Sequence, residues 1–129
     1  MMDAPSRHMI AIVDDDRLVR ESFKDCMESA DYDARAFSSA EEFLASNFAG
    51  SADCLILDVR LPDMNGLELQ RKLVALGCRL PIVFVTAHGD DAIRDQAVRQ
   101  GAAGFLKKPV NREKLLESIH GALQSRRED

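Results

Sequence analysis

Acidic residues follow two apolar runs of the chain, at the points where those runs end. Asp14 and Asp15 come directly after Met9–Val13, and Asp58 comes directly after Cys54–Leu57. Carboxylates that share one place repel each other, so they retain a proton unless a cation lies among them. Oxygen ligands without His or Cys favour a hard ion, and Mg²⁺ (or Mn²⁺) fits best. We therefore expect a metal site with Asp15 and Asp58 as ligands and Asp14 acting through a metal-bound water.

Two more polar side chains end later apolar runs. Thr86 follows Leu80–Val85, and Lys108 follows Gly104–Lys107. A hydroxyl and an ammonium are suitable donors to phosphoryl oxygens. With Asp58 as the nucleophile, this set predicts acceptance of a phosphoryl group, a reaction that depends on positioning and charge neutralisation. Each residue alone is more often a helix cap or an ordinary loop residue, whereas the complementary set favours a site.

The elements that must position these residues alternate between strand and helix. Unbroken apolar runs bounded by turn residues predict strands buried on both faces, and apolar residues three and four apart predict amphipathic helices. Ser38 and Glu41 have the spacing of a capping box, and Asn65, Asp90 or Asp91, and Asn111 are candidate helix starts. The expected strands are 9–13, 32–37, 54–57, 80–85 and 104–107; the expected helices are 17–30, 38–47, 65–76, 91–100 and 111–124.

Five strand–helix units predict an α/β fold with parallel strands, right-handed crossovers and helices on both faces. The flavodoxin-like (βα)5 order 2-1-3-4-5 suits this number of units and makes strands one and three neighbours. Asp14, Asp15 and Asp58 would then share one pocket. We expect an N-terminal extension over residues 1–8, one domain over 9–124, and a tail or the start of a linker over 125–129.

Composition limits the possible partners. The chain has 129 residues and a formal net charge of −5, which argues against direct nucleic-acid binding by this domain. There is no apolar run of membrane-spanning length, and Met1–His8 is too short and polar for a signal peptide. Cys26 and Cys54 lie at apolar positions, which favours thiols in a reducing compartment. We expect a cytoplasmic protein without membrane contact.

Taken together, the motifs resemble the receiver domains of two-component response regulators. The matching segments are Val13-Asp-Asp15, Leu57-Asp58 with Leu61-Pro-Asp-Met-Asn-Gly66, Val85-Thr-Ala87 and Lys107-Lys-Pro109. They cover essentially the whole chain, and the segment after Asp58 is most similar to FixJ-type transcription regulators. The resemblance implies that Asp58 receives a phosphoryl group from a sensor histidine kinase, which makes the chain an enzyme only toward its own Asp58.

The resemblance also implies further roles. The backbone carbonyl of Arg60 becomes the third protein ligand of the metal, and Thr86 and Lys108 bind the phosphoryl group. Thr86 and Phe105 become the switch that repositions the face made by helix four, strand five and helix five. That face would control an output domain or downstream protein, with pairing of two copies through helix four and strand five upon phosphorylation. Arg60 and His88 lie where they could tune hydrolysis of the acyl phosphate, or they could be ordinary surface residues.

Three other functions agree with parts of this pattern. A phosphatase with an Asp nucleophile needs a second Asp two residues later as its acid–base catalyst, and that position holds Arg60. A flavin binder needs a first loop that cradles phosphate, which Asp14–Asp16 would repel. A phosphorylation-independent interaction module is the third, and it leaves the complete set of chemical residues without a use.

Overall fold

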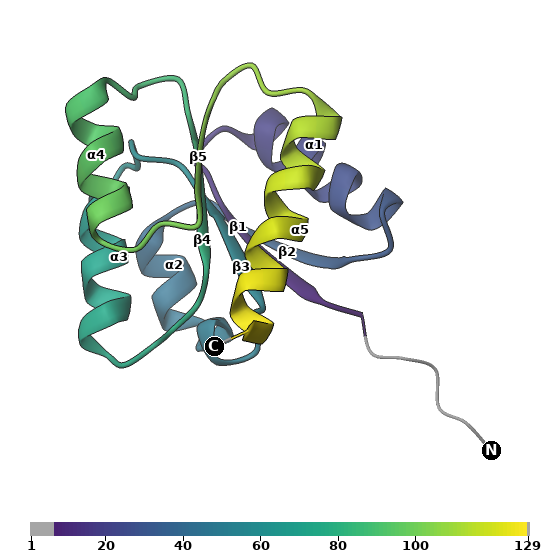
Figure 1. Ribbon diagram of the computed structural model, residues 1–129, viewed down its shortest axis with the longest axis horizontal. Coiled ribbons are helices and arrows are strands. Elements are labelled where there is room, and N and C mark those ends of the chain that lie inside the picture. The colour runs from purple at the N-terminus through teal and green to yellow at the C-terminus, as the bar shows by residue number, and fades with distance from the viewer. Residues whose placement is uncertain (1–6, 129) are drawn as a thin grey trace.

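A parallel sheet of five strands in the order β2-β1-β3-β4-β5 forms the centre of the protein (Figure 1). The structure is a computed structural model that describes residues 7–128. The strands are β1 Met9–Val13, β2 Asp33–Phe37, β3 Cys54–Leu57, β4 Ile82–Thr86 and β5 Gly104–Lys107. The helices are α1 Arg17–Ser29, α2 Ala40–Ala45, α3 Gly66–Ala75, α4 Asp91–Arg99 and α5 Arg112–Glu128, with a 3₁₀ turn η1 at Phe48–Gly50. The predicted fold class and strand order are confirmed.

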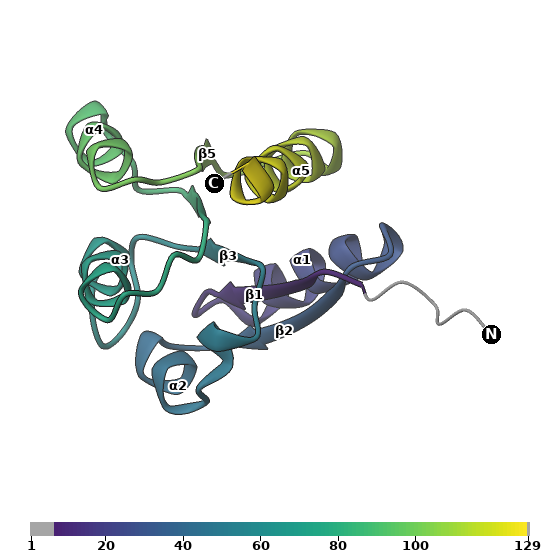
Figure 2. The same ribbon diagram turned by 60° about the horizontal axis from the view of Figure 1, so that its bottom comes forward.

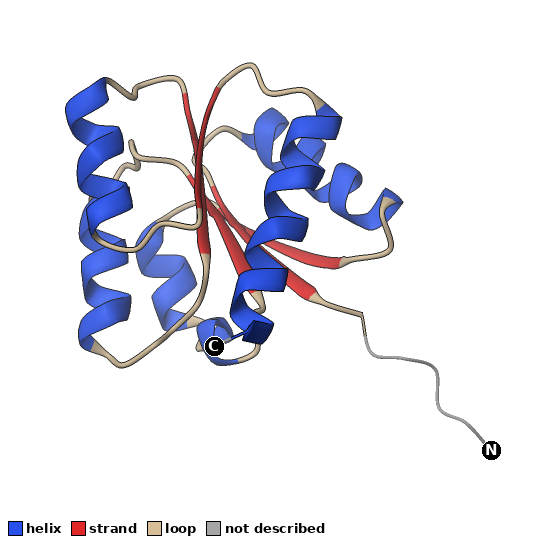
Figure 3. Cartoon of the chain, viewed as in Figure 1, coloured by secondary structure: helices blue, strands red, loops and turns tan. Residues whose placement is uncertain are grey.

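The helices divide into two groups because side chains alternate along each strand. Ala11, Val13, Leu55, Leu57 and Phe84 point to the face covered by α2, α3 and α4. Ile10, Ile12, Ile56, Val83 and Val85 point to the face covered by α1 and α5. Figure 2 shows these groups on opposite sides of the sheet, and Figure 3 shows the strands enclosed between them. Both faces of the central strands are thus buried, as their unbroken apolar sequences require.

Short polar side chains begin the helices, and left-handed residues end several of them. Asp16, Asn65 and Asp90 each accept a hydrogen bond from a backbone N–H in the first turn of α1, α3 and α4. Gly77 and Gly101 have φ of 75° and 99° after α3 and α4. A positive φ favours glycine, and this arrangement closes the last carbonyl groups of a helix. Within residues 7–128, no helix has the length and apolar character needed to cross a membrane.

Several element boundaries differ from the expectations. Ser39, not Ser38, caps α2 by accepting from Glu42 N, and Ser38 instead donates to the Glu42 carboxylate. Helix α2 ends at Ala45, two residues early, and η1 follows it between the expected helix 38–47 and the expected strand 54–57. Strand β4 begins at Ile82, not at residue 80, because Pro81 has no N–H to donate to a neighbouring strand.

The two ends of the chain bear on the expected limits of the domain. Helix α5 continues to Glu128, through residues expected to form a tail. Of the expected N-terminal extension, residues 1–6 lie outside the described part. His8 is described: its carbonyl accepts from Asp33 N, and its ring meets the edge of Tyr32. The proposed limits of the domain, 9–124, stay a prediction.

A distant carboxylate completes the cap of α2. Asp63, in the loop after β3, accepts hydrogen bonds from Glu41 N at 2.6 Å and Ala40 N at 3.3 Å. These are the first N–H groups of the helix, which have no partner within it. Burial raises the pKa of Asp63, but the hydrogen bonds led by Glu41 N outweigh it and bring the pKa below its ordinary value of 3.8. The loop after Asp58 is thereby tied to α2.

We expect Asp63→Ala to lower the free energy of unfolding at pH 7 by about 1 kcal/mol, the usual value of a helix cap. Because the pKa of Asp63 is lowered by folding, its contribution is complete above the unfolded-state pKa. It is lost as the pH falls through the lower folded-state pKa. Urea unfolding at pH 7 and at the lowest pH that keeps the protein folded measures both effects. Asp63→Asn, the matched control, keeps an acceptor without the charge and should lose less stability. An equal effect of Asp63→Ala at both pH values would contradict this account.

Candidate functional site

Asp14 and Asp58 lie side by side at the carboxyl edge of the sheet. Val13 of β1 is paired with Leu57 of β3, so the residues that follow them are delivered to the same place. Asp58 N donates to Val13 O at 3.1 Å, which fixes the two strand ends together. Asp14 is 2% exposed and Asp58 is 5% exposed. Two acids so deeply buried need a positive partner.

Lys108, which follows the edge strand β5, supplies that partner. Its Nζ lies 2.7 Å from Asp14 Oδ2 and 2.9 Å from Asp58 Oδ2. Thr86 pairs with Lys107 at the ends of β4 and β5, and Lys108 N then donates to Thr86 O at 3.0 Å. The peptide bond between Lys108 and Pro109 is cis. A single ammonium thus joins the ends of β1, β3 and β5.

The third carboxylate is that of Asp15. Carboxylate oxygens of Asp14, Asp15 and Asp58 all lie within 4.8 Å of one another, and Asp15 is the exposed member. Three carboxylates against one ammonium leave an excess of negative charge. This oxygen-only, negatively charged set fits a hard divalent cation. The structure therefore brings together the three carboxylates expected at the metal site.

Burial and ion pairing act against each other in this cluster. Burial raises the pKa of Asp14, and the hydrogen bonds from Lys108 and Asp16 N only partly offset it. Burial lowers the pKa of Lys108, but its hydrogen bonds to Asp14 and Asp58 outweigh this and the net shift is upward. Lys108 is therefore held in its charged form, the form that attracts an anionic group.

Thr86 lies at the same edge, but its hydroxyl bonds elsewhere. The side chain is fully buried, and Oγ1 accepts a hydrogen bond from His88 N at 3.1 Å. His88 itself is exposed. Arg60 is also exposed, and its backbone N–H donates to Asp58 Oδ1 at 3.3 Å. Thr86 is thus engaged with its own loop, and Arg60 and His88 lie at the rim.

Phe105 is half-buried on β5, where its ring centroid lies 5.9 Å from that of Phe84. The ring also packs on Gly89, since a Cβ added to Gly89 would lie 2.6 Å from Phe105 Cε1 and 3.2 Å from Thr86 Cγ2. A residue without a side chain here lets the ring and the threonine approach the loop before α4. Sequence reasoning missed Gly89, because nothing local shows which ring will lie above it.

The packing role of Gly66 was also not predicted, because it depends on how the loop folds back onto Asp58. The Gly66 N–H donates to Val59 O at 2.7 Å and closes the loop that begins at Asp58. A Cβ on Gly66 would lie 2.3 Å from Asp58 O, closer than real atoms approach. The only sequence signal is a glycine directly after the capping Asn65. Gly66 therefore allows the backbone of Asp58 to lie directly against α3.

The family described as response regulator receiver domain matches residues 10–120. The transcriptional regulatory protein TdiR of Thauera aromatica is 40% identical over 119 residues, which cover 92% of this chain and 52% of TdiR. The response regulator protein TmoT of Ectopseudomonas mendocina is 43% identical over 116 residues, 90% of this chain and 53% of TmoT. The crystal structure of FixJ-N has a TM-score of 0.81 and 34% identity, with 96% of each chain covered. The chain spans about half the length of TdiR and TmoT.

The close approach at Gly66 gives a stability test with an internal control. We expect Gly66→Ala to lower the free energy of unfolding by about 1–3 kcal/mol, the usual cost of overpacking, because the methyl group meets backbone that cannot move aside. Gly121, in α5, has open space around it. Gly121→Ala should raise stability by about 0.5–1 kcal/mol through helix propensity alone. Urea unfolding at pH 7 compares the two, and a neutral or stabilising Gly66→Ala would refute the crowding argument.

Proposed function

Because the chain belongs to the response regulator receiver domain family, we propose that it is a phosphorylation-activated switch in which Asp58 accepts the phosphoryl group. The observation that supports this most directly is the cluster of two buried acids paired with the half-buried Lys108. Lys108 Nζ bridges Asp14 Oδ2 and Asp58 Oδ2 at the sheet edge where strands deliver Asp15 and Thr86. The set combines a nucleophile, a fixed positive charge and a hydroxyl within one site.

The donor is the phosphohistidine of a sensor kinase. An oxygen of the Asp58 carboxylate attacks phosphorus, and the bond from phosphorus to the imidazole nitrogen breaks with its electron pair left on nitrogen. The product is an acyl phosphate on Asp58. In hydrolysis, a water oxygen attacks phosphorus, the Asp58 carboxylate leaves, and inorganic phosphate is released. Both steps concern only the protein's own Asp58.

Asp15, Asp58 and the backbone carbonyl of Arg60 would hold Mg²⁺ or Mn²⁺, with Asp14 contributing through a water. When bound, the cation neutralises negative charge that would otherwise repel a phosphoryl donor. Lys108 remains beside Asp58 and attracts an oxygen of the incoming phosphoryl group. Arg60 N, already bonded to Asp58 Oδ1 at 3.3 Å, fixes the orientation of the nucleophile.

Thr86 and Phe105 carry the change away from the site. In the structure, Thr86 Oγ1 is bonded to His88 N, so its hydroxyl hydrogen is available to a new acceptor. Donation to the phosphoryl group would draw the loop from Thr86 toward Asp58, and Phe105, which packs on Gly89 of that loop, would turn inward. Two packed states of α4, β5 and α5 with different populations describe the output. Arg60 and His88, exposed at the rim, tune the rate of hydrolysis.

The switch works in the cytoplasm and acts on a further part of a longer regulator or on a separate protein. The relatives named above are about twice as long as the chain, and one of them is a transcriptional regulatory protein. An output domain that controls transcription therefore supplies the nucleic-acid contact that this acidic domain lacks. Pairing of two copies through α4 and β5 upon phosphorylation would couple the switch to that output. The family gives no support to the phosphatase or flavin alternatives.

Incubation with acetyl phosphate and Mg²⁺, followed by intact-protein mass spectrometry, tests the role of Asp58. We expect one added phosphoryl group in the wild type and none in Asp58→Asn or without the metal, because the amide is a poor nucleophile. Asp16→Asn is the matched control: Asp16 lies near the cluster but caps α1, so this variant should be labelled normally. Full labelling of Asp58→Asn would remove Asp58 from the role proposed for it.

A further inference from the structure

Helix α4 is weakly packed against the rest of the protein. Ala97 is its only fully buried residue, and Val98 is 54% exposed. The cap at its N-terminal end, Asp90, is exposed as well. Apolar contact therefore holds α4 poorly, and the few polar bonds that reach it become important.

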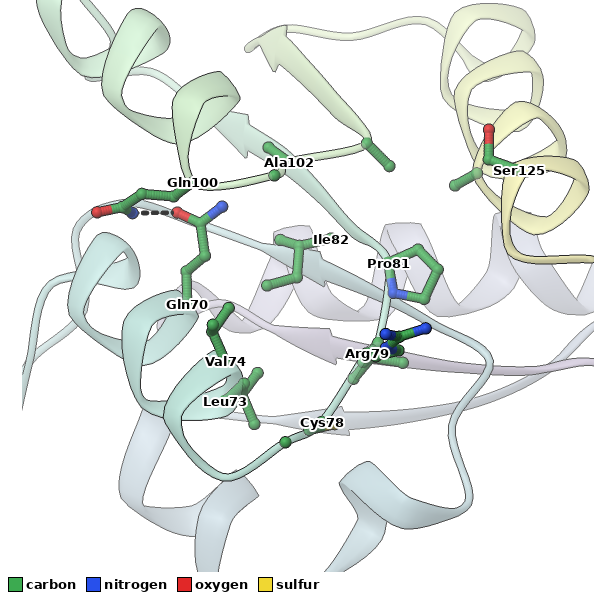
Figure 4. Close-up of a pocket in the computed structure, with 15 residues that line it drawn as sticks. Gln70, Leu73, Val74, Cys78, Arg79, Pro81, Ile82, Gln100, Ala102 and Ser125 are labelled. Atoms are coloured by element: carbon green, nitrogen blue, oxygen red, sulfur yellow. Dashed lines mark hydrogen bonds between the residues drawn. The ribbon is translucent and has the colours of Figure 1, made fainter. Parts of the chain in front are cut away.

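Those bonds come from a buried glutamine of α3. Gln70 is 1% exposed, its Nε2 donates to Ala97 O at 3.0 Å, and its Oε1 accepts from Gln100 Nε2 at 2.6 Å. Figure 4 shows the two amides facing each other. On the outer side, Gln100 Oε1 accepts from Arg71 Nη1 at 3.2 Å. We call Gln70 and Gln100 the amide clamp.

The amide clamp holds the C-terminal cap of α4. Ala97 O, which accepts from Gln70, also accepts from Ala102 N at 2.9 Å. Gly101, with φ of 99°, closes the same cap by donating to Val98 O at 3.0 Å. The Ala97 carbonyl thus accepts two hydrogen bonds, one from the backbone that ends its own helix and one from the Gln70 side chain of α3. Any rotation of this end of α4 would have to break the clamp.

A hollow beside the clamp limits its apolar support. A pocket of about 590 Å³ lies between α3, the start of β4 and the turn after α4, and its walls include Leu73, Ile82 and Ala102. Gln70 and Gln100 form part of its lining (Figure 4). Ala102 packs against the core that includes Leu73 and Ile82, but this space limits close apolar packing between the turn and α3. The side-chain hydrogen bonds of Gln70 and Gln100 attach the turn to α3.

The other end of α4 leads directly to the proposed switch. Thr86 Oγ1 accepts from His88 N, and Gly89 lies against the ring of Phe105. Asp90 then caps the helix through Ile93 N at 2.9 Å. A shift of Thr86 toward Asp58 would therefore pull on the N-terminal end of α4, while the clamp holds the C-terminal end.

We propose that the amide clamp is the pivot of α4. Gln70 and Gln100 are positioning residues that fix the C-terminal cap, so that the movement of the Thr86–Asp90 loop becomes a swing of the N-terminal half of the helix. The trigger of this swing rests on the proposed function. The clamp itself acts in the unphosphorylated protein and is measured there.

Hydrogen exchange of the full chain, followed by NMR, tests the clamp without any ligand. Gln70→Met keeps the side-chain volume and removes both hydrogen bonds. We expect the amides of Gln100, Gly101 and Ala102 to exchange about fivefold to thirtyfold faster in this variant, the factor that one or two hydrogen bonds produce. The amides of β4 report global unfolding and should not change by that factor.

Two further variants keep the test decisive. Gln100→Met removes the bond to Gln70 Oε1 from the half-exposed side but leaves the bond from Gln70 Nε2 to Ala97 O, so it should reproduce part of the effect even if Gln70→Met unfolds. Gln96→Met is the matched control, since Gln96 Nε2 only approaches Gln100 Oε1 at 3.5 Å and does not join α4 to α3. Unchanged exchange at residues 100–102 in both clamp variants would overturn the clamp. An equal acceleration of exchange in β4 would overturn it as well.

Beryllofluoride with Mg²⁺, a mimic of the acyl phosphate, then tests the pivot. In the wild type, we expect changes in exchange at residues 87–95 and none at residues 100–102. In Gln100→Met, the change should spread to residues 100–102. A wild-type response that already includes residues 100–102 would overturn the pivot. A wild type in which beryllofluoride alters nothing, including the Asp58–Gly66 loop, would instead count against the proposed function, and the ligand-free comparison still decides on the clamp.

Discussion

One half-buried ammonium, that of Lys108, holds the carboxyl edge of this sheet together. Without Lys108, the strand ends after β1 and β3 would place Asp14 and Asp58 beside each other, both excluded from water, with only repulsion between them. Lys108 Nζ contacts both carboxylates at 2.7 and 2.9 Å and comes from the far strand, β5. The pair of acids is tolerated because this charge is present. A cluster of this kind contributes little to stability by itself, but loss of one partner is costly.

The same arrangement keeps the site ready for chemistry. Negative charge remains in excess, which a divalent cation can balance, and the N–H of Arg60 orients Asp58, the proposed nucleophile. Around this fixed centre, the loop after Asp58 is held by Asp63 on α2 and by the close approach of Gly66 to Asp58 O. These contacts fix the loop that follows Asp58, beside the buried acids.

The part of the protein that we propose to move comprises the loop from Thr86 to Asp90, the ring of Phe105 and helix α4. The hydroxyl of Thr86 is bonded within its own loop, the ring of Phe105 rests on Gly89, and α4 has one fully buried residue. The amide clamp gives this weakly packed helix a fixed end. In our account, a small event at Asp58 becomes a larger movement because stability is unevenly distributed along the chain.

Local patterns predicted most of the fold, and the misses share a cause. Apolar runs, the caps Asn65 and Asp90 and the terminating Gly77 and Gly101 all act through neighbours in sequence, and the strand order that follows from them is confirmed. The strand ends also implied which polar residues meet. By contrast, the roles of Asp63 and Gln70 come from partners 22 and 27 residues away. Gly89 depends on a ring on another strand, and no local spacing encodes such contacts.

The hydrogen-bond partners within the site were harder still to predict from the sequence. Sequence could place Thr86 at the sheet edge, but the choice of His88 N as its partner depends on the path of the loop. The cap was misplaced by one residue because Ser38 and Ser39 each have a glutamate three residues later, and the spacing does not distinguish them. The proposed roles of the site residues stay predictions for experiment.

The central claim is that the ammonium of Lys108 shares the carboxylates that would receive the cation. Calorimetric titration with Mg²⁺ of the wild type, Lys108→Met and Lys107→Met tests it directly, since Lys107 is the exposed neighbour on the same strand end. Removal of the competing positive charge should tighten Mg²⁺ binding about tenfold or more in Lys108→Met. In Lys107→Met, whose charge is screened by solvent, the affinity should change little. Equal affinities in all three proteins would contradict the account.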